Sequence, residues 1–187
     1  MNEPADEPVR DSVEPFGESH EPVRDSHCSS CGAPFAAAGW PRTCPSCGTT
    51  AYRNPLPVAV ALLPVRDERG TGLVVITRAI EPQAGGTALP GGFIDGTETW
   101  QHAVVRELRE ETGIPARQQD VRLADARSSP DGHLLLFGLL PEREAAGLPP
   151  SGPTDETTGR HILRAAADLC FPLHTAVVRD WFAGRFS

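Results

Sequence analysis

The apolar residues of this chain are concentrated in short runs of strand length. Five segments rich in aliphatic residues are bounded by glycine, proline or charged residues, which is the pattern of buried strands. They are residues 57–63, 72–78, 121–128, 133–140 and 161–164. Residues 66–70 and 129–132 have the composition of turns that would join neighbouring strands.

Two other segments have helical periodicity. Residues 98–112 place apolar side chains at intervals of three and four, with Asp95 or Thr97 as candidate caps before them and Gly113 as a terminator after them. Residues 172–186 form a second amphipathic pattern. Strands, a helix, more strands and a closing helix predict an α/β fold, an α/β/α sandwich around a mixed sheet.

Charge and composition separate residues 1–26 from the rest of the chain. This stretch holds eight acidic and two basic residues, which is −6 of the net charge of −8 carried by all 187 residues. It repeats one hexamer at 7–12 and 21–26. We expect a disordered acidic tail, because such a composition buries too little apolar surface to fold. The repeat is either a partner-binding motif or a neutral duplication.

The remaining charge pattern narrows the classes of function. No basic tract exists that would neutralise phosphates in general nucleic-acid binding. No apolar run reaches the length of about 18 residues that indicates a membrane span. We therefore expect a cytoplasmic protein with one catalytic domain and a small-molecule ligand, and a homodimer is left open.

Four of the five cysteines form two Cys-x-x-Cys pairs, and each pair is followed by a glycine. Four thiolates at this spacing are typical of a structural Zn²⁺ site, so we predict a zinc ribbon over residues 27–50. The alternatives are a redox dithiol or an iron site. The four predicted ligands are Cys28, Cys31, Cys44 and Cys47. Cys170 stands in an apolar stretch and is predicted to be a buried hydrophobic residue.

Three carboxylates share one arc of the first predicted helix. Glu107, Glu110 and Glu111 stand at positions i, i+3 and i+4, so their side chains are neighbours on the helix surface. Like charges this close favour a hard divalent cation among them, and Mg²⁺ also takes phosphate oxygens. Gly91 and Gly92 precede the helix and allow the backbone to approach closely. The alternative is a solvated face paired with the helix arginines.

The wider spacing of these residues resembles a known signature. Gly92, Glu98 and the run Arg106-Glu107-Leu108-Arg109-Glu110-Glu111-Thr112-Gly113 fill every fixed position of the Nudix box. That family hydrolyses a nucleoside diphosphate linked to another moiety. The resemblance implies a Nudix domain over residues 51–187, with Glu107, Glu110, Glu111 and the Gly91 carbonyl as ligands of Mg²⁺ or Mn²⁺.

The resemblance also implies roles outside the helix. In several members of the family the general base is a glutamate beyond the box, and here Glu156 is the first candidate and Asp155 the second, within the loop predicted for residues 141–160. Arg78, at the end of a predicted strand, is a candidate phosphate ligand or a surface ion-pair partner. Arg106 and Glu98 are predicted to form a structural pair that fixes the loop.

The substrate is the least determined property. A zinc ribbon before a Nudix domain is similar to the NADH pyrophosphatases over residues 27–186, but their Ser-Gln-Pro-Trp element is replaced by Ser128-Ser129-Pro130-Asp131, without Gln or Trp. Pro130 matches a proline of many ADP-ribose pyrophosphatases. We therefore favour ADP-ribose or a related nucleotide sugar, with NADH or NAD as the alternative. Decapping of RNA has no support in charge or aromatic motifs. A non-catalytic nucleotide-sensing module is the rival from another class.

Overall fold

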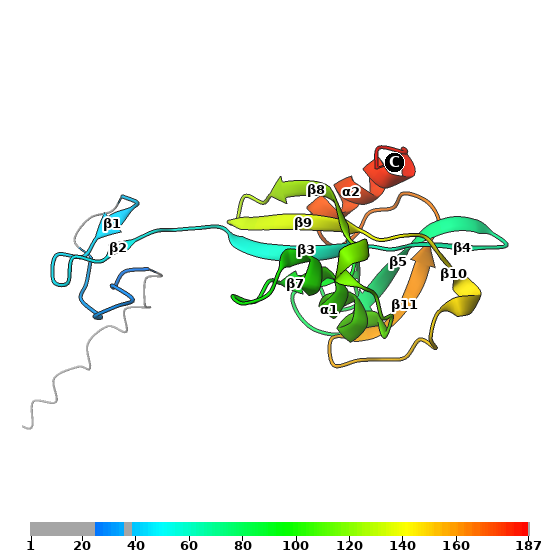
Figure 1. Ribbon diagram of the computed structural model, residues 1–187, viewed down its shortest axis with the longest axis horizontal. Coiled ribbons are helices and arrows are strands. Elements are labelled where there is room, and N and C mark those ends of the chain that lie inside the picture. The colour runs from blue at the N-terminus through cyan, green and yellow to red at the C-terminus, as the bar shows by residue number, and fades with distance from the viewer. Residues whose placement is uncertain (1–24, 36–38, 187) are drawn as a thin grey trace, which may run out of the picture. The chain divides into compact units, whose positions relative to one another are not determined.

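The computed structural model describes residues 25–35 and 39–186, and the chain divides into two compact units after Arg53 (Figure 1). The predicted tail therefore lies outside the described residues except for its last two. In the first unit, β1 (Arg42–Thr43) pairs antiparallel with β2 (Thr50–Ala51). The larger unit begins at Asn54 and contains both helices and all the other strands of the described chain.

The larger unit has two sheets. One has the order β7-β3-β9-β8, in which β3 and β9 are parallel and the other pairs are antiparallel. Its strands are β3 (Leu56–Leu62), β7 (Gly91–Phe93), β8 (Arg122–Ser128) and β9 (His133–Leu139). The sheet is thus mixed, as predicted.

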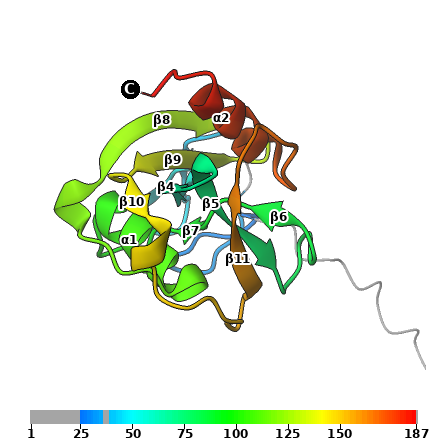
Figure 2. The same ribbon diagram turned by 90° about the vertical axis from the view of Figure 1, so that its right-hand side faces the viewer.

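The second sheet has the order β10-β4-β5-β11, with β6 attached to β5 (Figure 2). Its strands are β4 (Pro64–Asp67), β5 (Gly70–Arg78), β6 (Thr87–Ala88), β10 (Arg143–Glu144) and β11 (Thr157–Leu163). β10 and β4 are parallel, and the remaining pairs are antiparallel. Short 3₁₀ turns cover Gln118–Asp120 (η1) and Ala145–Gly147 (η2).

Two helices cover opposite sides of these strands. α1 (Trp100–Thr112) packs on alternate residues of β3 such as Ala59 and Ala61, whereas α2 (Pro172–Phe182) packs in the cluster that holds the residues between them, Val60 and Leu62. Both faces of β3 are therefore buried, which explains why its sequence is apolar throughout. The predicted α/β/α sandwich is confirmed. No helix of the described residues is long and apolar enough to cross a membrane.

The first predicted helix begins later than expected. Its N-cap is Thr99, whose Oγ1 accepts a hydrogen bond from the backbone N–H of His102 at 3.2 Å, so neither Asp95 nor Thr97 is the cap. Glu98 stays outside the helix because its carboxylate accepts a hydrogen bond from the Asp95 N–H at 3.0 Å. The end is as predicted, with Gly113 in the left-handed region at φ 72°.

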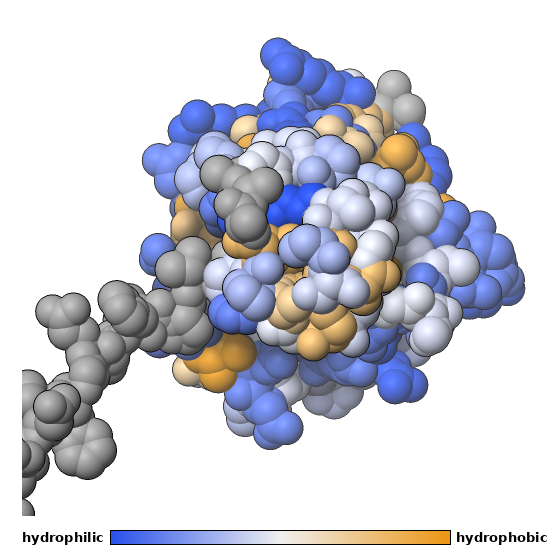
Figure 3. Space-filling view, turned by 90° about the vertical axis from the view of Figure 1, so that its left-hand side faces the viewer, coloured by the Kyte–Doolittle hydropathy of each residue, from blue (hydrophilic) through white to orange (hydrophobic). Residues whose placement is uncertain are grey.

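Several loops predicted from the sequence contain short strands. Gly91–Phe93 forms β7 by pairing with β3, although two of its three residues are glycines. The predicted loop 141–160 holds β10, η2 and the first residues of β11, which starts at Thr157. The closing helix stops at Phe182. The face shown in Figure 3 carries both hydrophilic residues and several hydrophobic patches. The large aliphatic side chains of the two cores are buried.

Candidate active site and cysteine cluster

The three helix glutamates have different environments. Glu107 and Glu111 are buried, with 8% and 3% of their surfaces exposed, whereas the side chain of Glu110 is half exposed. The buried pair faces β7, which is held against β3 by a backbone hydrogen bond on either side, from Ala61 N–H to the Pro90 carbonyl and from Ile94 N–H to the Pro57 carbonyl. α1 thus presents two carboxylates to the glycine-rich strand.

Glu111 is held by the glycine segment. The backbone N–H of Gly91 donates a hydrogen bond to its Oε2 at 2.8 Å. Burial, followed by the charges of Glu107 and Glu156, raises the pKa of Glu111 to about 8, against the opposing effects of the Gly91 N–H and of Arg78. The site therefore concentrates negative charge that it cannot neutralise fully by itself.

The surroundings of Gly92 explain why the box has a glycine at this position. A Cβ at this position would lie 2.4 Å from Oε1 of Glu107, so any other residue would displace that carboxylate. A Cβ at Gly91 would lie 2.4 Å from the carbonyl oxygen of Ala59 on β3. Both glycines are required for the close approach of β7 to its neighbours, as the sequence predicted for this segment.

Arg106 joins the loop to the helix. Its Nη2 donates to Glu98 Oε1 at 2.7 Å and to the Phe93 carbonyl at 3.0 Å, which places Arg106 and Glu98 as the expected pair. Its Nη1 also donates to Glu107 at 2.7 Å and to Glu110 at 3.1 Å. The hydrogen bond from Arg106 lowers the pKa of Glu98 to about 2. One guanidinium therefore serves as the counter-charge of three carboxylates.

β11 brings Glu156 to the helix. Thr157 is fully buried, pairs with Arg78 of β5, and donates a hydrogen bond from Oγ1 to the Glu111 carbonyl at 3.0 Å. Its neighbour Glu156 contributes to the raised pKa of both Glu107 and Glu111 through its charge. Asp155, the second candidate, is exposed.

Arg78 lies at the same end of the strand pair. Its Nε donates to the Pro82 carbonyl at 2.9 Å, and its guanidinium stacks over the Phe171 ring at 5.3 Å. Within the described residues it forms no ion pair, so the alternative of a surface salt bridge is not realised there. Its charge lowers the pKa of Glu111, which shows that it acts on the same site.

An aromatic surface beside the box was missed in the sequence. Phe93, directly after Gly92, is 56% exposed, and its ring centroid lies 5.7 Å from that of His133. Asp131, which replaces the expected tryptophan, instead contacts Ser129 and His133 in its own turn. An exposed aromatic residue within a functional box was the signal that could have indicated this surface.

The carboxylates fit a divalent cation by their chemistry. Two buried carboxylates with raised pKa values are oxygen ligands that a hard cation would stabilise. Their oxygens are not gathered as tightly as a closed metal cage: among the described residues, the cysteine sulfurs alone form a set of three or more ligand atoms within 4.8 Å of one another. The glutamate site is therefore an open set of ligands with room for further oxygens.

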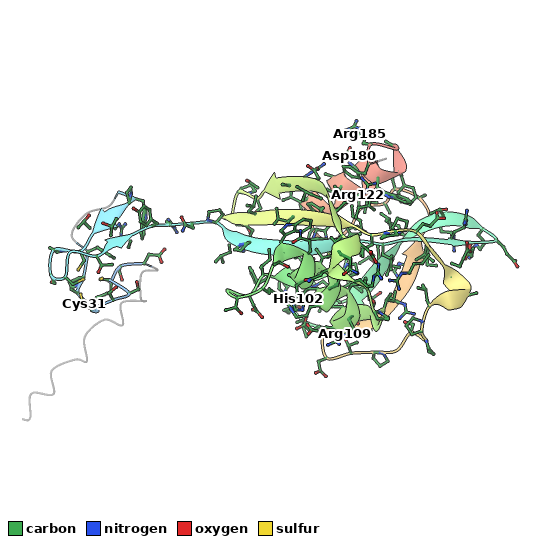
Figure 4. All side chains as sticks on the ribbon, viewed as in Figure 1. Cys31, His102, Arg109, Arg122, Asp180 and Arg185 are labelled. Carbon is green, nitrogen blue, oxygen red and sulfur yellow. The ribbon has the colours of Figure 1, made fainter. Side chains whose placement is uncertain are left out.

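The four sulfurs of the cysteine cluster lie within 4.8 Å of one another. The Sγ atoms of Cys28 and Cys47 lie 3.8 Å apart and those of Cys31 and Cys44 lie 3.6 Å apart. Bonds of about 2.3 Å to one tetrahedral ion would separate the sulfurs by about 3.8 Å, so the spacing fits. Cys31 lies in this small unit, among its other sulfur atoms (Figure 4).

The two cysteine pairs have the same local structure. Gly32 and Gly48 both adopt φ 74°, and their N–H groups donate to the carbonyls of Cys28 and Cys44 at 2.8 and 2.9 Å. A left-handed residue after each pair requires glycine, which explains the two glycines noted in the sequence. Each pair thus turns tightly enough to direct both sulfurs to one point.

Comparison with known proteins identifies the larger unit. The profile of the NUDIX domain matches residues 55–181. The NAD-capped RNA hydrolase NudC of Chromobacterium violaceum is 28% identical over 151 residues, covering 80% of this chain and 54% of that protein. The ADP-ribose pyrophosphatase of Methanocaldococcus jannaschii is 40% identical over 72 residues, covering 36% of this chain and 41% of that protein. This chain spans about half the length of these relatives.

A solved structure gives the same fold. The NUDIX hydrolase of Nitrosomonas europaea superposes with a TM-score of 0.64 at 22% identity, covering 86% of this chain and 92% of that one. The matched profile also contains α1 and the loop before it, where the box residues lie. This protein therefore belongs to the Nudix hydrolase family.

Proposed function

We propose that this enzyme hydrolyses the diphosphate linkage of a nucleoside diphosphate joined to another moiety, with ADP-ribose or a related nucleotide sugar as the favoured substrate. The observation that carries the proposal is the burial of Glu107 and Glu111 against the glycine strand, next to Glu156 and Arg78. Carboxylates, a cation and a Cβ-free backbone are the groups that a metal-bound diphosphate requires.

Glu107, Glu110, Glu111 and the Gly91 carbonyl would hold Mg²⁺ or Mn²⁺. The bound ion would supply charge neutralisation at the diphosphate and a more acidic water. Arg78, whose guanidinium contacts the Pro82 carbonyl and the Phe171 ring, would bind a phosphate oxygen. Glu156, the proposed general base, would accept the proton of the attacking water at its carboxylate oxygen.

The first unit is proposed to hold one structural Zn²⁺ at its four cysteines. The sulfur spacing and the matching glycine turns support this ion over a redox dithiol, which would need only one of the pairs. Since the unit has only two short strands and little core, the ion would supply most of its stability.

Two observations bear on the substrate. The higher identity, 40%, is to a protein named ADP-ribose pyrophosphatase, although over a shorter segment than the match to the NAD-capped RNA hydrolase. Phe93, which is exposed, and the partly buried His133 offer a ring surface on which a base could stack. Phe93 follows Gly92 in the chain but pairs with Val58, so its ring lies on the face of the sheet opposite to α1. That surface keeps NADH and NAD as the alternative substrates despite the missing Gln and Trp.

A substrate panel tests the proposal. Purified full-length protein would be assayed with ADP-ribose, a nucleoside diphosphate hexose, NADH, NAD and NAD-capped RNA, each with Mg²⁺ or Mn²⁺. We expect the highest kcat/KM on ADP-ribose, and a loss of turnover in Glu111→Gln. Faster hydrolysis of NADH or of the capped RNA would replace the favoured substrate. Nucleotide binding without hydrolysis of any of them would support the nucleotide-sensing module instead.

A further inference from the structure

A second pocket lies away from the glutamate site. It has a volume of about 430 Å³, within the range of small-molecule sites, and is bordered by β11, η2 and the turn between β4 and β5. β11 and β10 are both visible from this side of the larger unit in Figure 2. No aspartate or glutamate is among the lining residues, but three arginines are: Arg69, Arg160 and Arg164.

Arg160 is held by backbone carbonyls only. Its Nη1 donates to the carbonyls of Thr112 and Pro150, and its Nη2 to that of Pro149. The Nε–H and one Nη2–H have no acceptor among the described residues, and no carboxylate there pairs with this cation. Burial lowers the pKa of Arg160, which reflects a charge that lacks compensation.

The other two arginines lie near one carboxylate, Asp67, which among the described residues pairs with the guanidinium of Arg164 only. Asp67 accepts a hydrogen bond from the backbone N–H of Arg69 at 2.8 Å and another from Nη2 of Arg164. The exposed guanidinium of Arg69 has no partner within the described part of the chain. Three cations therefore line the pocket with one carboxylate beside them, and their mutual repulsion favours an anion.

The spacing along β11 adds an apolar floor between the cations. Arg160, Ile162 and Arg164 alternate along the strand, so they project from the same face with about 7 Å between neighbours. Ile162 is opposite Val74 of β5 in the ladder, and both line the pocket together with Leu148. A ligand that fits would combine a strong negative charge with an apolar ring.

We propose that this pocket binds a phosphate monoester carrying a ring system, such as a nucleoside monophosphate, separately from the site of hydrolysis. The phosphate would be bound by Arg69 and Arg164 at one end of the pocket, because guanidinium groups match phosphate geometry, and Arg160 would lie at the other end, beyond the ring. The ring would lie over Ile162 and Leu148. The proposal does not depend on which diphosphate the enzyme hydrolyses.

Titration of the full-length protein with AMP and, separately, with inorganic phosphate tests the proposal. No divalent ion is added, so that binding at the glutamates is disfavoured. Amide NMR signals locate the bound ligand, and calorimetry under the same conditions measures its affinity. We expect shifts at Ser151 and Ile162 rather than at Gly91. AMP should bind at least about fivefold more tightly than phosphate, because it alone covers the apolar floor.

Arg69→Gln is the informative variant, because this side chain has no partner whose loss would disturb folding. It should weaken AMP binding by about fivefold or more, since a charge-assisted contact is removed. Arg117→Gln is the matched control: Arg117 pairs with Asp120 at 3.0 Å, does not line the pocket, and should bind AMP like the parent.

Three results would overturn the proposal. They are unmoved Ser151 and Ile162 signals at millimolar AMP, parent-like affinity in Arg69→Gln, and equal affinity for phosphate and AMP. The first would mean that the arginines are merely solvated. The second would place the ligand elsewhere, and the third would remove the role of the apolar floor.

Discussion

Replacing Glu111 with glutamine should stabilise the metal-free enzyme while it removes activity. The pKa of Glu111 is raised from 4.5 to about 8 in the folded protein. A carboxyl group with a raised folded pKa contributes full stability below its unfolded pKa, and this contribution is lost as the pH rises towards about 8. Glutamine keeps the size of the side chain and an oxygen for the Gly91 N–H, but it has no proton to lose.

The magnitude follows from the pKa difference. Each pH unit between the unfolded and folded pKa costs the parent about 1.4 kcal/mol. The variant should therefore gain less than about 1 kcal/mol over the parent near pH 5, and about 3 kcal/mol near pH 7. Turnover at pH 7 should fall by at least about one order of magnitude, because a proposed metal ligand is removed.

Urea denaturation without added divalent ions measures the difference. The helical circular dichroism signal is a suitable probe, because α1 and α2 both lie in the larger unit. Glu142→Gln is the control: its partners are the exposed Arg66 at 3.4 Å and Thr71 at 2.8 Å, so the change should stay within about 0.5 kcal/mol at either pH. A Glu111→Gln variant that is less stable than the parent near pH 7, or equally shifted at both pH values, would refute the reasoning.

Four further predictions concern the zinc site, the N-terminal tail, Gly91 and Glu110. Elemental analysis should find about one zinc per chain, and a Cys28→Ser, Cys31→Ser double variant that keeps the same content would contradict the zinc site. Removal of residues 1–24, which spares the contacts of Asp25 and Ser26 with Arg42 and Phe35, should leave Tm and turnover nearly unchanged, whereas a Tm lower by several degrees would show that the tail packs on the protein. Gly91→Ala should lower Tm in a thermal scan, because its Cβ would lie 2.4 Å from the Ala59 carbonyl oxygen; a parent-like Tm would refute that clash. In steady-state assays Glu110→Gln should reduce kcat by about one to two orders of magnitude, and parent-like turnover would exclude it as a ligand.

The sequence predicted the structure well where one residue type strongly favours one local structure. The apolar runs predicted buried strands because both faces of β3 are covered, and Gly113 predicted the end of α1 because its φ of 72° favours glycine. The cysteine spacing predicted the cluster because each Cys-x-x-Cys pair forms the same tight turn, and the two turns bring the four sulfurs together. These features depend on residues close to one another in the chain.

The sequence was less informative where a structural feature depends on contacts between distant segments of the chain. β7 has weak strand propensity and forms because β3 supplies its hydrogen-bonding partner. The approach of Glu156 to α1 depends on the pairing of Thr157 with Arg78, which no local pattern contains. The link from Arg106 to Glu110 is an i, i+4 contact that the sequence allowed, but its bond to the Phe93 carbonyl required the folded loop.

The β-bulge at the start of β11 gives the length of one short segment an unusual importance. Thr157 pairs with Arg78 and Gly159 with Thr77, so Thr158 is an additional residue in that strand. The extra residue lets Thr157 and Gly159, two positions apart, pair with neighbouring residues of β5, while Thr157 donates its hydrogen bond to the Glu111 carbonyl. The position of the proposed base, Glu156, relative to α1 therefore depends on the one-residue offset at this point of β11, and less on which residue provides that offset.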